Sequence, residues 1–182
     1  HIIFEKYYMK NTYCFFLSNF NRLYLKVLTL VFNLKFAPFV SFNSSSRVDK
    51  RVRIDFHGLR DSSFKLTLGK RVRVYNDVLF QGTGNICIGE NTYIGAFSVL
   101  GSYDSISIGK NVMIAQSVSI RDHNHGFNDL DIPMRDQGII KSPIVIEDNV
   151  WIGYGVIINK GVTVKNGAIL AAIAIPPCFV VS

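Results

Sequence analysis

An aliphatic residue recurs at every sixth position through most of the chain from residue 48 onward. Corresponding positions in successive groups lie 20 residues apart, so each group contains three hexads and a two-residue corner. A repeat this short cannot bury its apolar face alone, and its neighbours must stack to form one continuous core. The positions in register are Val48, Ile54, Leu68, Val74, Phe80, Ile88, Ile94, Leu100, Ile108, Ile114, Ile120, Ile146, Ile152, Ile158, Val164 and Leu170.

Each hexad supplies a short strand and a turn, and three hexads close one triangular coil. Stacked coils then pair at the usual strand spacing of about 4.8 Å. The residue after the aliphatic is often small, which suits a corner where a side chain would be crowded or a positive φ is needed. Examples are Gly69, Gly89, Gly95, Gly109, Ala115 and Gly153. The repeat predicts an all-β fold, a parallel β-helix of about five triangular coils over residues 46–177.

An aromatic and leucine-rich segment, residues 13–42, precedes the repeat, within an N-terminal helical segment of residues 1–45. Its uncharged runs, such as Val27 to Leu34, are far short of the roughly 20 residues that a membrane span needs. Helical spacing places Arg22, Lys26, Thr29 and Asn33 on one stripe and Phe16, Phe20, Leu23, Val27, Leu30 and Leu34 on the opposite side. This pattern predicts an amphipathic helix that packs on its own protein or a neighbouring subunit, or else lies on an anionic membrane surface.

The net charge of +7 arises entirely in the first third of the chain. Residues 1–60 hold ten Lys and Arg against three acids, whereas residues 61–182 hold ten of each. Recognition motifs for nucleic acid are absent, so the charge favours an anionic membrane or a phosphorylated substrate as partner. Three widely spaced cysteines, Cys14, Cys87 and Cys178, indicate neither a disulfide framework nor a metal site, and we expect structural roles and a cytoplasmic setting.

Three stretches, "IGENTYIGAFSV", "IGKNVMIAQSVS" and "IEDNVWIGYGVIINKGVT", resemble the hexapeptide-repeat acyltransferases. Within that family the chain looks most like the sugar O-acetyltransferases that modify bacterial O-antigen, capsule or exopolysaccharide. The resemblance implies a left-handed parallel β-helix, a homotrimer with active sites between subunits, acetyl-CoA as co-substrate, and no metal. The implied acceptor is a sugar or a lipid-linked glycan at the inner face of the bacterial plasma membrane, which residues 13–42 would contact.

The sequence "IRDHNHGF", residues 120–127, stands where the repeat breaks, and residues 126–143 form a loop without register. The resemblance implies that a histidine at this break is the general base. In related sugar acetyltransferases that residue falls seventeen positions after the aliphatic that opens its coil; counted from Ile108 this is His125, with His123 as the alternative. An imidazole with a free pKa near 6.5 suits proton removal from a sugar hydroxyl, worth roughly a hundred- to ten-thousandfold in rate.

Further site residues follow from the same resemblance. Polar candidates for orienting the ring or binding the acceptor are Tyr103, Asp104, Asp122, Asn124 and Gln137. Residues expected along the CoA arm are Trp151, Gly153, Tyr154, Lys160 and Ala172. His57 is expected to be structural.

Two departures from the family pattern matter. Gly95 stands where the family often has an acceptor-binding Asn, and the ending "GAILAAIAIPPCFVVS" lacks several residues between Ile173 and Ile175 that help to bind CoA.

Two alternatives remain beside O-acetylation. N-acetylation of an amino-sugar nucleotide would use the same base, and a non-catalytic β-helix scaffold would fit the shortened ending. A zinc carbonic anhydrase is disfavoured, because the histidines have unsuitable spacing for three metal ligands.

Overall fold

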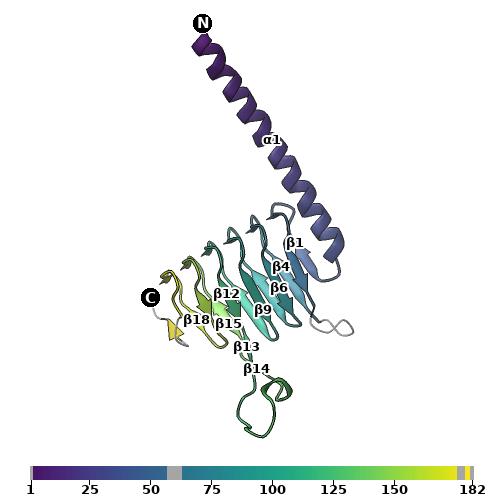
Figure 1. Ribbon diagram of the computed structural model, residues 1–182, viewed down its shortest axis with the longest axis vertical. Coiled ribbons are helices and arrows are strands. Elements are labelled where there is room, and N and C mark those ends of the chain that lie inside the picture. Colours follow the sequence, from purple (N-terminus) through teal and green to yellow (C-terminus); the bar gives the residue numbers. More distant parts are fainter. Residues whose placement is uncertain (1, 57–62, 176–178, 181–182) are drawn as a thin grey trace.

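A computed structural model describes residues 2–56, 63–175 and 179–180. Helix α1 (Ile2–Phe36) is followed by a parallel β-helix whose strands form three sheets (Figure 1). The first sheet contains β1 (Val40–Phe42), β4 (Lys65–Leu68), β7 (Asn85–Ile88), β10 (Ser105–Ile108), β15 (Ile144–Ile146), β18 (Thr163–Val164) and β20 (Phe179–Val180). The second contains β2 (Arg47–Val48), β5 (Arg73–Val74), β8 (Tyr93–Ile94), β11 (Met113–Ile114), β16 (Trp151–Ile152) and β19 (Ile169–Leu170). The third contains β3 (Arg53–Asp55), β6 (Leu79–Gly82), β9 (Val99–Ser102), β12 (Ser119–Arg121) and β17 (Ile157–Ile158).

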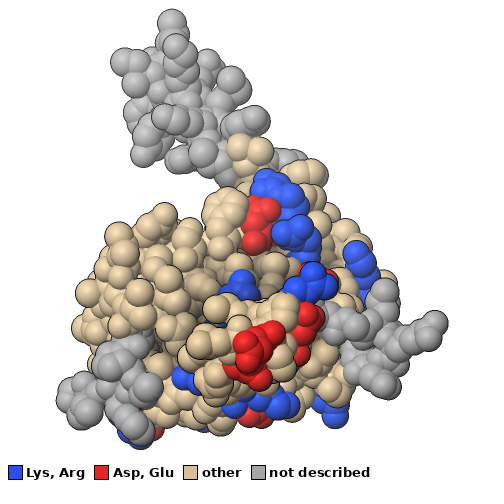
Figure 2. Space-filling view, turned by 60° about the horizontal axis from the view of Figure 1, so that its bottom comes forward, with Lys and Arg blue, Asp and Glu red and all other residues tan. Residues whose placement is uncertain are grey.

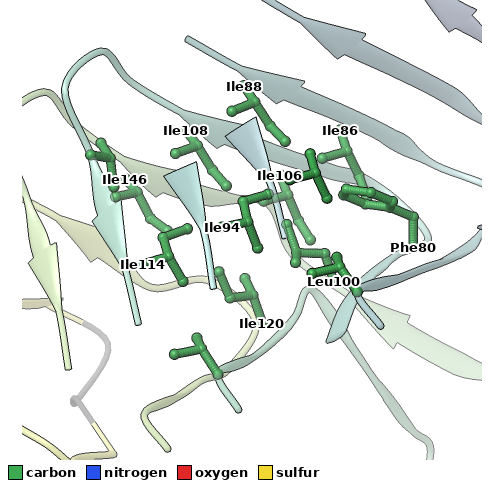
Figure 3. Close-up of a cluster of buried hydrophobic side chains, with 14 of the residues drawn as sticks. Phe80, Ile86, Ile88, Ile94, Leu100, Ile106, Ile108, Ile114, Ile120 and Ile146 are labelled. Carbon is green, nitrogen blue, oxygen red and sulfur yellow. The ribbon is translucent and has the colours of Figure 1, made fainter. Parts of the chain in front are cut away.

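The six-residue spacing places one aliphatic on each sheet of every coil, and the 20-residue spacing stacks equivalent residues. Ile94, Ile114 and Ile152 face one another across paired strands, and all three are fully buried. Phe80, Leu100 and Ile120 form the equivalent column on the third sheet, and Figure 3 shows both columns meeting in the interior. The β-helix predicted from the repeat is confirmed, with a single continuous core.

The β-helix begins earlier than the repeat predicted. Strand β1 pairs in parallel with β4, with Val40 opposite Leu66, so the first sheet already includes residues assigned above to the helical segment. The helix ends at Phe36 rather than extending through residue 42. Strand β1 lacks the hexad pattern, and only its pairing with β4 identifies it as part of the β-helix.

The small residues after the aliphatics are explained by crowding and not by a positive φ. A Cβ on Gly89 would lie 2.5 Å from the carbonyl carbon of Gly109 in the next coil, closer than any real Cβ contact. The positive φ angles lie two residues further on, at Asn91 (60°) and Asn111 (56°). Asn tolerates this left-handed conformation. In these hexads the small residue therefore relieves the crowding, and the Asn two positions later takes the positive φ.

Helix α1 packs on its own β-helix, but not through its apolar stripe. Thr29, Phe32 and Phe36 are buried, and the Thr29 hydroxyl accepts a 2.9 Å hydrogen bond from the Val48 amide. The side chains of the stripe that begins at Phe20 are instead exposed, and Leu30 among them borders a hollow against residues 42–47. Within the described residues, no helix has a stretch both long and apolar enough to cross a membrane.

Candidate active site

The candidate site lies at the corner where the chain passes from the third sheet to the first, which we call the loop corner (residues 83–84, 103–104, 122–143 and 159–162). Here β13 (His123–His125) pairs with β14 (Ile139–Lys141) in an antiparallel hairpin that projects from the β-helix (Figure 1). The loop predicted over residues 126–143 is therefore partly ordered as a strand, and the short 3-10 helix η1 (Met134–Asp136) lies within it. This break in the repeat carries both histidines.

Asp122 is the buried centre of this corner, with no exposed surface. Its Oδ1 accepts a 2.8 Å hydrogen bond from the Tyr103 amide, and its Oδ2 accepts one of 2.9 Å from the Asp104 amide and lies 2.8 Å from the Ser102 hydroxyl. Burial of a carboxyl group costs free energy unless such donors satisfy its oxygens. These contacts hold Asp122 inside the protein, so it faces His123 and the backbone and not an acceptor.

His123 lies directly over this carboxylate. Its Nδ1 is 3.2 Å from Asp122 Oδ1, and its side chain is only 11% exposed. The Tyr103 ring packs on the imidazole with a centroid distance of 4.3 Å. A Cβ on Gly101 would lie 3.3 Å from His123 Cε1, so the missing side chain of Gly101 leaves room for the ring. The imidazole is thereby fixed on three sides.

The other residues of the hairpin have looser surroundings. His125 and Asn124 are exposed, and they pair only through the backbone with Ile139 and Ile140. Gln137 uses its amide within the loop: Nε2 donates to the carbonyls of Asp129 (2.6 Å) and Ile132 (2.7 Å), and Oε1 accepts from the Asp129 amide. In this arrangement Gln137 braces the loop rather than facing an acceptor.

Tyr103 and Asp104 lie beside His123 at the loop corner, where the Tyr103 ring contacts the imidazole and the Asp104 amide donates to Asp122. Burial, together with the negative charge of Asp55, raises the pKa of the Tyr103 phenol above its usual value of 10.0. Tyr103 therefore stays protonated at neutral pH and can serve as a hydrogen-bond donor. Lys141, on the facing strand β14, donates a 3.1 Å hydrogen bond from Nζ to the Tyr103 carbonyl. The positive charge of Lys141 therefore lies beside the backbone of Tyr103.

Four of the five residues expected along the CoA arm gather at another corner, between the second and third sheets, which we call the Tyr154 corner (residues 96–97, 116–117, 153–156 and 171–174). The Tyr154 carbonyl accepts a 2.7 Å hydrogen bond from the Ile173 amide, and a Cβ on Gly153 would lie 2.7 Å from the Ala172 nitrogen. Trp151 is half exposed on the adjoining strand β16. The fifth, Lys160, lies at the loop corner, one coil beyond the hairpin.

Sequence reasoning missed Ser102, Gly101 and Lys141. A signal for the first two was present, because Ser102 is 20 residues before Asp122 and Gly101 is 20 residues before Arg121, which stacks them in adjacent coils. Lys141 carried no such signal, since its position depends on the antiparallel hairpin.

Some expectations cannot be compared with the structure. His57 and the Pro-Pro of the C-terminal sequence lie outside the described residues, as does Cys178, whereas Cys87 is exposed on the first sheet. Across the described ranges, no three His, Cys, Asp or Glu side chains converge where a metal ion could bind.

The arrangement is suited to acid–base chemistry. When His123 Nδ1 carries the proton, its N–H can donate a hydrogen bond to Asp122. The lone pair of Nε2 is then available to accept a proton from a bound acceptor. The buried carboxylate fixes this tautomer and stabilises the imidazolium that forms, as in other His–carboxylate pairs. His125 has no comparable partner among the interactions described here.

Comparisons with known proteins agree with this fold and repeat. Residues 85–121 and 143–172 match the family model described as the hexapeptide repeat of succinyl-transferase. The structure is similar to that of AntD, an N-acyltransferase from Bacillus cereus. The TM-score is 0.62 at 20% sequence identity, over 78% of this chain and 75% of the AntD chain. These similarities support a left-handed parallel β-helix built from hexapeptide repeats as the fold of this chain.

The chain is also similar to several curated acetyltransferases. A probable acetyltransferase of Mycobacterium tuberculosis is 36% identical over 50% of this chain and 31% of its own length. The galactoside O-acetyltransferase of Escherichia coli is 35% identical over 58% of this chain and 51% of its own, and that organism's putative lipopolysaccharide biosynthesis O-acetyltransferase WbbJ is 31% identical over half of each. The chain thus spans about half, or less, of the length of these relatives.

Proposed function

We propose that this protein transfers an acetyl group from acetyl-CoA to a sugar hydroxyl, with His123 as general base. The observation that carries the proposal is the buried Asp122 carboxylate 3.2 Å from His123 Nδ1, at the break in an acyltransferase-type β-helix. The counting argument from Ile108 favoured His125, and the geometry favours His123, because only His123 is packed and oriented by a carboxylate.

The proposed reaction proceeds by direct transfer without a covalent acyl-enzyme. His123 takes the proton of the acceptor hydroxyl through Nε2 as that oxygen attacks the thioester carbonyl, and the C–S bond then breaks. The imidazolium returns the proton to the departing thiolate, so the histidine ends in its starting state. A backbone N–H of the following coil would stabilise the oxyanion.

A sugar acceptor is supported by the relatives. Galactoside O-acetyltransferase and WbbJ both transfer to oxygen by their names, whereas AntD is an N-acyltransferase solved with dTDP-4-amino-4,6-dideoxyglucose and CoA. The His123–Asp122 pair fits the harder of the two transfers, because a sugar hydroxyl keeps its proton until it reacts and so needs a base. N-acetylation of an amino-sugar nucleotide is the second candidate, supported by the fold similarity to AntD.

A complete site requires a second subunit in this proposal. Trp151, Tyr154 and Ala172 lie at a different corner of the β-helix from His123, so within one chain the CoA residues do not border the base. A homotrimer would bring the Tyr154 corner of one copy beside the loop corner of the next. Figure 2 shows Lys and Arg side chains grouped on one face, with Asp and Glu among them, and an anionic, lipid-linked acceptor would be attracted to these basic groups.

The first test is the release of free CoA thiol from acetyl-CoA in the presence of a panel of galactosides, amino-sugar nucleotides and lipid-linked glycan precursors. We expect His123→Ala to lower the acceptor-dependent rate by roughly a hundredfold or more, because it removes the base. His125→Ala, two residues along the same strand, is the matched control and should keep most of the activity.

Each outcome has a definite meaning. Loss confined to His125→Ala would keep the activity and reverse the assignment of the base. Release only with amino-sugar acceptors would make the protein an N-acetyltransferase. Binding of acetyl-CoA without release from any acceptor, or no binding at all, would favour the non-catalytic scaffold.

A further inference from the structure

The exposed apolar side chains of helix α1 form an unpartnered stripe. Five of them are about half exposed or more: Phe20 69%, Leu23 61%, Val27 49%, Leu30 57% and Leu34 71%. Figure 1 shows that α1 extends well beyond the stacked strands, so most of this stripe is remote from the β-helix. A contiguous exposed apolar surface of this kind marks an interaction site.

The spacing of the stripe identifies what it fits. The steps between these residues are three, four, three and four, which is the a/d pattern of a heptad repeat. In the sequence the same alternation continues to Phe16 and Tyr13, which gives three successive heptads. A stripe with a repeat of 3.5 residues can face a partner helix along its whole length when the partner has the same repeat. Identical chains meet this condition, so the stripe is complementary to its own copy.

The positions beside the stripe argue against a lipid surface. On one flank lie Leu17, Tyr24 and Val31, and on the other Asn19, Lys26 and Asn33, so one charge occurs among six flanking positions. A helix that lies on a membrane needs a strongly charged face turned to water. The opposite face of α1 instead packs on the β-helix through Thr29, Phe32 and Phe36.

We propose that the exposed Phe20–Leu34 stripe of α1 packs against α1 of other copies of this chain as a parallel coiled coil. In a cyclic assembly whose rotation axis runs along α1, the helices of all copies point the same way and their stripes meet in a parallel bundle. Leu17 and Val31, both exposed, widen the stripe on one flank, and a wider stripe suits more than two helices. The inference does not rest on the proposed enzymatic activity, because its evidence lies outside the loop corner.

Cross-linking of the full chain tests the proposal. In a background with Cys14, Cys87 and Cys178 replaced by Ser, we would introduce Leu23→Cys or Leu30→Cys at the stripe, or Asn21→Cys on the exposed surface outside it. A short bismaleimide should join copies through residues 23 and 30 but not through residue 21, because only stripe positions meet their own counterparts in a parallel bundle.

A second variant separates the coiled coil from lipid binding. Leu23→Glu/Leu30→Glu should weaken self-association, measured by sedimentation, by about tenfold or more, and flotation with vesicles of phosphatidylcholine and phosphatidylglycerol should be absent in both proteins. Cross-linking at residue 21 as strong as at 23 would overturn the proposal. So would the absence of cross-linking at both stripe positions, whether or not the wild-type protein floats with vesicles.

Discussion

At the scale of single residues, one carboxylate organises the candidate site. Asp122 brings together the amides of two residues in the preceding coil and the ring of His123, and its oxygens are otherwise sealed from water. Such a group can set the tautomer of a histidine while contributing to local stability. His123 owes its fixed orientation to this carboxylate, the Tyr103 ring and the space over Gly101.

Asp122→Asn should act on the reaction through His123. Because the amide cannot accept the Nδ1 proton in the same way, we expect kcat to fall roughly ten- to a thousandfold while the KM for acetyl-CoA changes little. The control is Asp148→Asn, which alters a carboxylate that accepts a hydrogen bond from the Lys110 amide at a different corner. Steady-state kinetics of the two variants decides the matter, and an equal loss in both would leave Asp122 with a structural role alone.

At the scale of elements, the corners of the β-helix carry backbone strain as well as functional residues. Ile173 adopts a φ of 61° at the Tyr154 corner, a conformation that a β-branched side chain adopts only at a cost. At the same corner of earlier coils, Gly155 (68°) and Asp77 (61°) adopt this conformation at lower cost. Ile173 is therefore poorly matched to the backbone conformation of its corner.

Ile173→Asn should stabilise the protein by about 1 kcal/mol, because it relieves this strain. Ile169→Asn is the paired control: Ile169 is similarly exposed, in strand β19, and its replacement by a poor strand former should be neutral or destabilising. Urea unfolding of both variants measures the difference. A loss of stability in Ile173→Asn would show that the Ile173 side chain is covered in the assembled protein.

At the scale of the whole molecule, the two halves of the proposed site lie at different corners of one chain. The loop corner holds His123, and the Tyr154 corner holds most of the residues expected to border CoA. A cyclic assembly with a heterologous interface brings unlike corners of identical chains together. Phe97, Trp151 and Tyr154 are exposed at or beside the Tyr154 corner, which is consistent with a surface that is covered in such an assembly.

Two inactive variants should restore activity when they are assembled together. His123→Ala lacks the base, and Ala172→Trp obstructs the exposed Tyr154 corner, so each is expected to be inactive alone. In randomly mixed oligomers about a quarter of the sites would combine an intact loop corner with an intact Tyr154 corner from its neighbour. Thiol release from the co-expressed mixture measures this recovery. No recovery, with mixed oligomers shown to form, would mean that each site lies within one chain.

The hexad spacing by itself determined the coil, its three sheets and its continuous core, because a six-residue period and a 20-residue turn allow one stacking only. It also located the break that carries the histidines. The choice between His123 and His125 could not be made from spacing, since both face alike in an extended segment, and burial over Asp122 distinguishes them only after the coils stack.

The same contrast holds for the N-terminal helix. Its periodicity determined an amphipathic helix, but the helix offers more than one face that can pack, and the sequence does not say which face meets the β-helix. The structure decided this through the Thr29 hydrogen bond to Val48 and the burial of Phe32 and Phe36, contacts between residues that are distant in sequence. Local pattern determines elements, whereas the partner of each surface depends on which distant surfaces fit it in three dimensions.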